Sequence, residues 1–177
     1  ICTVRAGNVI GGGDWSEDRL IPDCVKNWSK KEITKVRNPN STRPWQHVLE
    51  AISGYLVLAS KLSKSHTLHG QSFNFGPASK KSNSVKKVLE LFKNYFLYSE
   101  YKFKENKRFK EAQLLSLNSS KARKLLNWKA NLTFIETISY VGNWYKNYYN
   151  GSKILTKEQI LSYQTLAKRR KLSWTRN

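Results

Sequence analysis

The sequence predicts an α/β fold with a smaller α+β part, because segments with strand and helix patterns alternate along the chain. Residues 1–4 are an apolar run with β-branched side chains, which leads through Asn8 to three consecutive glycines at 11–13. This pattern indicates a buried strand that ends where the backbone must turn without side-chain interference. Since ligands of open α/β sheets bind beyond the carboxyl ends of strands, the segment predicts a ligand site.

The first part of the chain is expected to pass from this strand into two helices. Leu20, Ile21, Val25 and Trp28 have helical spacing, and the proline in that first turn is compatible with a helix. An Asn-Pro-Asn-Ser sequence then predicts a turn. The expected elements are a strand over 1–10, a loop over 11–18, a helix over 19–31, a strand over 33–37, a turn over 38–41, an extended stretch over 45–48 and a strongly apolar helix over 49–62.

The rest of the chain mixes short strands with amphipathic helices. Val85, Val88 and Phe92 share one helical face, and Ser119 or Ser120 can cap a later helix. The expected elements are a strand over 73–75, helices over 84–96, about 119–128, about 133–148 and 156–172, and strands near 101–105 and 114–117.

The composition is that of a folded protein. The chain has 177 residues, enough to bury a core, and contains six Trp, nine Tyr and seven Phe. No apolar stretch approaches the roughly 20 residues of a membrane helix, and no signal-peptide pattern opens the sequence. Cys2 and Cys24 lie on separate expected elements without a Cys-x-x-Cys spacing, so we expect buried, reduced thiols and a cytoplasmic location.

The net charge of +20 is unevenly distributed. Residues 1–60 carry eight Lys/Arg against six Asp/Glu, whereas 80–110 carry ten against three and 151–177 carry seven against one. The excess therefore falls mainly on segments with amphipathic helical patterns and on the tail, which favours solvated lysine faces over a nucleic-acid interface. No nucleic-acid-binding motif and no zinc-ligand spacing supports the alternative.

The glycine run only partly matches a dinucleotide-binding loop. Gly11 and Gly13 fit the Gly-x-Gly-x-x-Gly pattern, but Ser16 occupies its third glycine position. No second strand with an acidic residue follows about 20 residues later. A loop over a ligand is the better interpretation.

The Tyr-x-x-x-Lys pattern occurs twice, in unsuitable settings. On a helix it would place a phenol one turn from an ammonium group that lowers the phenol pKa. Tyr98 and Lys102 lie in a segment that resembles a strand or loop, and Tyr149 and Lys153 flank an Asn-Gly helix stop. Neither pair is expected to be catalytic.

Two further groups of residues are ambiguous on their own. Arg43 follows a turn, where its guanidinium could grip a diphosphate with two parallel hydrogen bonds, but without further context a surface arginine is the favoured interpretation. His47 fits a packed, hydrogen-bonded histidine better than a catalyst. Arg108 and Glu111 could bind a phosphate and a sugar diol, or form a solvated ion pair.

Together these segments resemble the CDP-glucose 4,6-dehydratases, extended short-chain dehydrogenase/reductases that act on nucleotide sugars. The resemblance covers essentially the whole chain, but only the carboxyl-terminal half of the family's sequence. The most specific motifs are Gly-Gly-Gly-Asp-Trp and Arg-Pro-Trp-Gln-His, where related enzymes usually have Asn-x-x-Gly-Pro and Arg-Asp-Trp or Arg-Asp-Tyr. The segments that carry the resemblance are 5–15, 18–23, 43–50, 53–56, 74–77 and 121–128.

The resemblance implies cofactor and substrate roles. Ala6 and Gly7 match positions whose backbone passes near the nicotinamide of NAD, and Asn8 matches an asparagine that reaches the substrate diphosphate or sugar. Arg43 matches an arginine that clamps the diphosphate. The other implied substrate-binding residues are Arg19, Leu20 and Ile21 over the nucleotide, Val36, Arg37 and Asn38 at a base expected to be cytosine, and Arg108 and Glu111 near the phosphate and ribose.

The resemblance also implies how the chain is organised. We expect a substrate-binding subdomain over about 11–48 and 78–177, interleaved with Rossmann elements over about 1–10 and 49–77. In the family, the NAD-binding half and the Tyr-x-x-x-Lys pair precede the segment that matches Ile1. We therefore expect a carboxyl-terminal portion without catalytic residues, metal or dehydratase activity of its own, and a homodimer for the full-length enzyme.

Three residues depart from the family pattern. Lys110 stands where His is frequent, which puts the contacts around 108–111 in doubt, while Asn118 replaces an Asp and Asn127 a Gly at capping and turn positions. The alternatives to the main hypothesis are another NAD-dependent nucleotide-sugar epimerase or dehydratase and, less favoured, a basic nucleic-acid-binding module.

Overall fold

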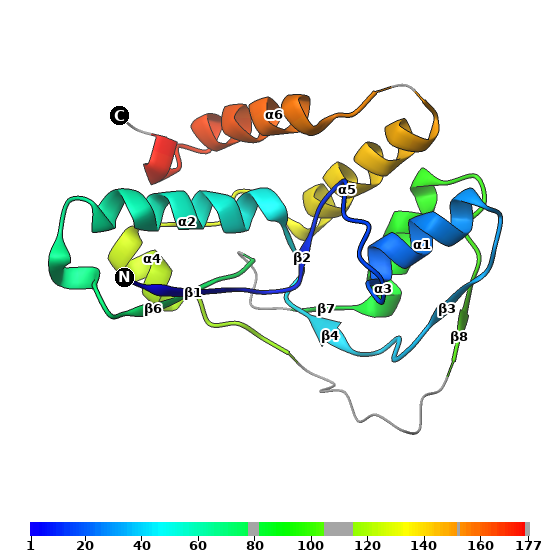
Figure 1. The fold of residues 1–177 in the computed structure, drawn as a ribbon, viewed down its shortest axis with the longest axis horizontal. Helices are drawn as coiled ribbons and strands as arrows, with labels where there is room; N and C mark the ends of the chain where they lie inside the picture. The colour runs from blue at the N-terminus through cyan, green and yellow to red at the C-terminus, as the bar shows by residue number, and fades with distance from the viewer. Residues whose placement is uncertain (78–81, 105–114, 152, 176–177) are drawn as a thin grey trace.

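The computed structural model describes residues 1–77, 82–104, 115–151 and 153–175, and Figure 1 shows how they are arranged. The strands in these ranges pair two by two. β1 pairs with β6, β2 with β5 and β3 with β8 in parallel, whereas β4 and β7 are antiparallel. The strands are β1 (Thr3–Ala6), β2 (Val9–Ile10), β3 (Thr34–Val36), β4 (Thr42–Arg43), β5 (Gln46–His47), β6 (Ser72–Phe75), β7 (Asn83–Ser84) and β8 (Tyr101–Phe103).

The helices form two groups around these strands. In Figure 1, α2 lies between the β1–β6 pair and α6, while α1, α3 and α5 gather at the other end of the molecule. Short 3₁₀ turns follow α2, α3 and α6. The helices are α1 (Leu20–Ser29), α2 (Val48–Leu62), α3 (Val85–Phe92), α4 (Ser120–Leu126), α5 (Phe134–Tyr149) and α6 (Thr156–Arg169).

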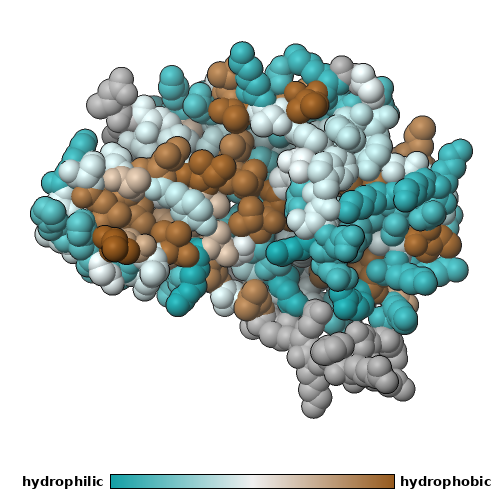
Figure 2. All heavy atoms as spheres, in the orientation of Figure 1, coloured by the Kyte–Doolittle hydropathy of each residue, from teal (hydrophilic) through white to brown (hydrophobic). Residues whose placement is uncertain are grey.

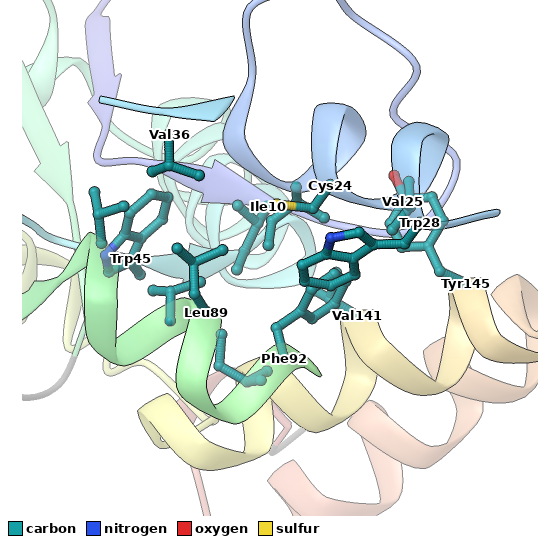
Figure 3. Packing of buried hydrophobic residues seen from close by; sticks show 14 of the residues in the cluster. Ile10, Cys24, Val25, Trp28, Val36, Trp45, Leu89, Phe92, Val141 and Tyr145 are labelled. Carbon is teal, nitrogen blue, oxygen red and sulfur yellow. The ribbon is translucent and has the colours of Figure 1, made fainter. Parts of the chain in front are cut away.

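Each helical group encloses its own hydrophobic cluster. In the first cluster, Val25 of α1, Phe92 of α3 and Val141 of α5 meet with no exposed surface (Figure 3). The second cluster joins α2, β6 and α4, and Trp128 lies edge-on to Phe75 with ring centroids 5.0 Å apart. The apolar faces expected for these helices therefore make the core.

The face that carries β1 and α2 keeps apolar side chains at the surface. Figure 2 shows them gathered there, and they include Ile1, Val4, Ile52 and Leu56. Within the described residues β1 pairs on one side only, with β6. In the same ranges, no helix is long and apolar enough to span a bilayer.

The expected α/β class is confirmed, but several boundaries were wrong. The strand expected over 1–10 is divided at Gly7 and Asn8, residues 115–117 form no strand, and position 114 lies outside the described residues. The helix expected to reach Trp128 ends at Leu126, because Asn127 takes the left-handed conformation (φ 53°), as the glycine usual there would.

The end of the last helix and the burial of Cys2 also differ from the predictions. The last helix ends at Arg169 and not at 172. Both cysteines are free, but only Cys24 is fully buried; Cys2 is half-buried, and its thiol donates to the Leu68 carbonyl oxygen.

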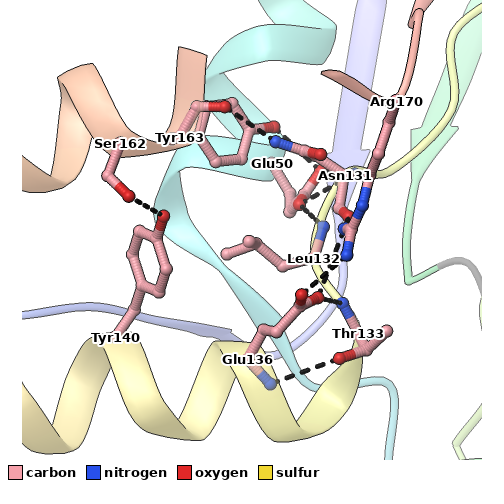
Figure 4. Close-up of polar contacts among 9 residues, drawn as sticks. All are labelled: Glu50, Asn131, Leu132, Thr133, Glu136, Tyr140, Ser162, Tyr163 and Arg170. Atoms are coloured by element: carbon pink, nitrogen blue, oxygen red, sulfur yellow. Dashed lines mark hydrogen bonds and ion pairs between the residues drawn. The ribbon is translucent and has the colours of Figure 1, made fainter. Parts of the chain in front are cut away.

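A buried carboxylate joins α2, the start of α5 and α6 (Figure 4). The Glu50 side chain is 1% exposed and accepts hydrogen bonds from the backbone N–H groups of Asn131 and Leu132 and from the Tyr163 hydroxyl. Arg170 extends the network by donating to the Asn131 carbonyl oxygen and pairing with Glu136 at 2.6 Å. Glu50 therefore anchors the carboxyl-terminal helix to the rest of the chain.

Two buried groups are expected to make stability nearly independent of pH between 4.5 and 6.5. Burial raises the pKa of Glu50 from 4.5 to about 7, so the folded state holds this proton more tightly and the stabilisation falls as pH rises through the window. Burial lowers the pKa of His47 from 6.5 to about 4, so its stabilisation is lost as pH falls. The contributions of Glu50 and His47 to the free energy of unfolding therefore change with pH in opposite directions.

The Glu50→Gln variant removes the pH dependence that Glu50 contributes to the free energy of unfolding and leaves the contribution of His47. Its free energy of unfolding is expected to fall by about 2–3 kcal/mol between pH 6.5 and 4.5, while the parent chain changes little. Urea titrations at both pH values measure the difference. Parallel pH profiles for the two proteins would contradict the assignment.

Candidate functional site

Two adjoining pockets lie where the chain passes from β1 to β2. One, of about 480 Å³, is lined by Ala6 and Gly7 at the end of β1 and by residues 115–117. The other, of about 210 Å³, lies between the start of α1, β3 and β4. Both are lined by Asn8, Asp14 and Arg19, so these residues stand where the pockets meet.

Most of the predicted site residues line these pockets. Asn38 lines neither: it lies in the turn after β3 at a positive φ of 48°, directly after Arg37. Arg108 and Glu111 lie outside the described residues. The pocket-lining residues are Ala6, Gly7, Asn8 and Arg19 in the first pocket, and Asn8, Arg19, Leu20, Ile21, Val36, Arg37 and Arg43 in the second.

Contacts between distant segments fix the end of β1. A Cβ atom on Gly7 would lie 2.7 Å from the Pro44 carbonyl oxygen, so the close approach of these segments requires glycine. The Asn8 carbonyl oxygen accepts the Gln46 N–H at 3.0 Å, and the buried Gln46 amide donates to the Phe75 carbonyl oxygen at 2.8 Å. Gln46 of β5 thus joins the segment between β1 and β2 to the end of β6.

A separate strand pair positions Arg43. In the antiparallel β4–β7 pair, Arg43 lies opposite Asn83, whose carbonyl oxygen accepts the indole N–H of the buried Trp45 at 2.9 Å. The Arg43 guanidinium donates to the Thr42 carbonyl oxygen at 3.0 Å. The strand pair and the Trp45 anchor place the base of the Arg43 side chain at the smaller pocket.

The smaller pocket is rich in charge of both signs. Arg19, Arg37 and Arg43 contribute cations, and Arg37 pairs with the exposed Asp18 at 3.7 Å. Burial, and then the neighbouring Asp18 carboxylate, raise the pKa of Asp23. Three guanidinium groups around one small pocket suit an anionic ligand with several oxygen atoms, such as a diphosphate.

His47, the glycine run and the two Tyr-x-x-x-Lys patterns have structural roles and do not form a catalytic group. His47 is 2% exposed and its Nδ1 accepts the Leu49 N–H, so the packed histidine is confirmed. The glycine run does not open a helix, because α1 begins only at Leu20. Tyr98 lies outside any helix and Tyr149 is the last residue of α5, so neither Tyr-x-x-x-Lys pattern has helical geometry.

Two residues at the site, Gln46 and Asp14, were not predicted from the sequence. Both belong to motifs named above: Gln46 lies in Arg-Pro-Trp-Gln-His, and Asp14 directly follows the three glycines.

A larger groove of about 790 Å³ lies between α2 and α6, lined by residues such as Ile52, Leu56 and Ile160. No predicted site residue lines it.

The chain is similar in sequence to a curated enzyme. No family model matches the chain. The chain is 36% identical over 174 residues to CDP-glucose 4,6-dehydratase of Salmonella typhimurium, an alignment that covers 96% of the chain and 48% of that enzyme. The chain therefore spans about half the length of the curated relative that it matches.

The fold is shared with solved nucleotide-sugar epimerases. UDP-glucuronic acid 4-epimerase from Bacillus cereus superposes with a TM-score of 0.68 at 16% identity, over 82% of this chain and 45% of that enzyme. UDP-glucose 4-epimerase from Thermotoga maritima gives a TM-score of 0.67 at 16% identity, over 83% and 46%. The chain is thus similar in sequence to the carboxyl-terminal half of CDP-glucose 4,6-dehydratase, and it has the Rossmann-type fold of the corresponding part of the extended short-chain dehydrogenase/reductases.

Proposed function

We propose that this chain carries the substrate-binding part of an NAD-dependent nucleotide-sugar 4,6-dehydratase that converts CDP-glucose to CDP-4-keto-6-deoxyglucose. The observation that carries the proposal is the meeting of Asn8, Arg19, Arg37 and Arg43 at two adjoining pockets. The 36% identity to CDP-glucose 4,6-dehydratase supports it.

The pockets suggest how such a ligand would lie. Arg43, Arg19 and Arg37 surround the smaller pocket, where they would bind the diphosphate. Val36, with Leu20 and the neighbouring turn, would contact the base there. The hexose would extend past Asn8 into the 480 Å³ pocket, towards the end of β1.

The 480 Å³ pocket lined by Ala6 and Gly7 would admit the edge of a nicotinamide ring. Ala6 and Gly7 have little or no side chain, and such backbone lets a flat ring approach closely. Bound NAD would supply hydride transfer from sugar C4 and back to C6, with water lost across C5 and C6 in between. Ala6, Gly7 and Asn8 would hold the sugar and the cofactor in contact, and the proton-transfer residues would correspond to the half of the relative that the alignment does not cover.

The core and the surface of the chain suggest how it is organised. The first hydrophobic cluster lies mostly in the ranges proposed for the substrate-binding subdomain, whereas the second joins the proposed Rossmann range 49–77 to α4. The exposed apolar face around the open edge of β1 is a surface that further protein would cover. We also propose a homodimer for the full-length enzyme and, from the two free cysteines, a cytoplasmic location.

Calorimetric titration with CDP-glucose, UDP-glucose and GDP-glucose tests the function. CDP-glucose is expected to bind at least about tenfold more tightly than the other two, because Val36 to Asn38 would recognise one base by hydrogen bonds. Tighter binding of UDP-glucose or GDP-glucose would favour a related epimerase or dehydratase. No binding of any nucleotide sugar would overturn the proposal.

A further inference from the structure

Asp14 occupies a central position in the candidate site. It lines both pockets and is located with Asn8 and Arg19 where they meet. It is half-buried, and its Oδ1 accepts the Ser16 N–H at 3.0 Å. Among the described residues, no cation lies within ion-pair distance of its carboxylate.

Aromatic residues of α5 hold the loop that carries Asp14. A Cβ atom on Gly12 would lie 2.0 Å from the Trp144 ring, so the loop backbone packs directly on this indole. The Tyr145 hydroxyl donates to the Asp14 carbonyl oxygen at 2.6 Å. Burial, and then the nearby Asp14, raise the pKa of Tyr145, so this phenol remains a donor at neutral pH.

Trp15, the next residue, packs on the same helix. Its ring centroid lies 5.0 Å from that of Tyr148 and 5.4 Å from that of Tyr145. The Lys26 ammonium group of α1 donates to the Trp15 carbonyl oxygen at 2.6 Å. The loop is therefore fixed on both sides of Asp14, which gives its side chain a defined position.

The charge of Asp14 restricts what it can contact. A carboxylate accepts hydrogen bonds and repels an anion, so it cannot serve the diphosphate. The reacting hexose must lie next to the cofactor, and Asp14 is one of the residues that line the pocket of Ala6 and Gly7. The hydroxyl groups of a hexose are the donors that come within its reach.

We propose that Asp14 is a sugar-binding residue whose carboxylate accepts a hydrogen bond from a hexose hydroxyl, and that Tyr145 and Trp144 are positioning residues that hold it at the junction of the pockets. The proposal rests on the proposed function, since it takes a nucleotide sugar as the ligand. Asp14 would thus be a specificity determinant that contacts the sugar and not the nucleotide.

The Asp14→Asn variant tests the sugar contact. Asparagine keeps an oxygen for the Ser16 N–H but loses the charge. Calorimetry is expected to show about tenfold weaker binding of CDP-glucose, as for a hydrogen bond to a charged group, and unchanged or slightly tighter binding of CDP. Equal losses for both ligands, or no loss for CDP-glucose, would overturn the proposal.

The Tyr145→Phe variant tests the positioning role, with Tyr148→Phe as the matched control. In the described part of the chain, the Tyr148 hydroxyl makes no hydrogen bond. Only Tyr145→Phe is expected to speed amide hydrogen exchange over residues 11–16 and to weaken CDP-glucose binding severalfold while leaving CDP binding unchanged. Equal behaviour of the two variants would refute the positioning role.

These outcomes separate the proposal from the proposed function. If the parent chain binds no nucleotide sugar, the proposed function fails first. If it binds CDP-glucose but Asp14→Asn binds it equally well, only the role of Asp14 fails. Combining Asp14→Asn with Tyr145→Phe is expected to cost no more than Asp14→Asn alone, because the second residue acts through the first.

Discussion

The Glu50→Ala variant is expected to unfold with a free energy about 3–4 kcal/mol below that of the parent chain at pH 6. The substitution leaves the N–H groups of Asn131 and Leu132 and the hydroxyl of Tyr163 without their shared acceptor, in a site closed to water. It also opens a cavity between α2 and α6. Urea denaturation followed by circular dichroism measures the change.

The Glu90→Ala variant is the matched control. Glu90 is an acidic residue of α3 whose ion pair with Lys87, at 3.6 Å, lies at the surface. Its loss is expected to change the free energy of unfolding by less than about 0.5 kcal/mol. If Glu50→Ala lowered the free energy of unfolding as little as Glu90→Ala does, the network around Glu50 would not anchor the carboxyl-terminal helix.

Much of the fold could be predicted because it depends on local patterns. The helical spacing of Val25, Val88 and Phe92 predicts faces that do meet in the core. The division of the first strand could not be predicted, since it depends on Pro44 approaching Gly7 from a distant segment. The β4–β7 pair likewise joins residues about 40 positions apart and has no local signal.

The site was predictable where motifs and strand ends coincide. Asn8 follows an apolar strand and precedes a glycine run, and it does line both pockets. Arg43 was ambiguous by itself, because a turn followed by an extended stretch also describes a surface arginine. Asp14 was missed because its position depends on Trp144 and Tyr145, which lie 130 residues away and give no sign of this in sequence.

The Arg43→Ala variant is expected to bind CDP about 30-fold more weakly than the parent chain. Hydrogen bonds between a guanidinium and a phosphate group are among the strongest single contacts to a ligand, and Arg43 lines the pocket assigned to the diphosphate. Cytidine lacks the phosphates, so its affinity is expected to change by less than about twofold. Calorimetry with both ligands isolates the diphosphate contribution.

The Arg5→Ala variant removes the same charge from β1, where the side chain is exposed and lines neither pocket. It controls for the long-range attraction that a chain of net charge +20 exerts on any anion. If Arg5→Ala weakened CDP binding as much as Arg43→Ala, the affinity would come from the overall field. A loss confined to Arg43→Ala and to CDP would instead place the diphosphate beside β4, because only a direct contact depends on both the position of the arginine and the presence of the phosphates.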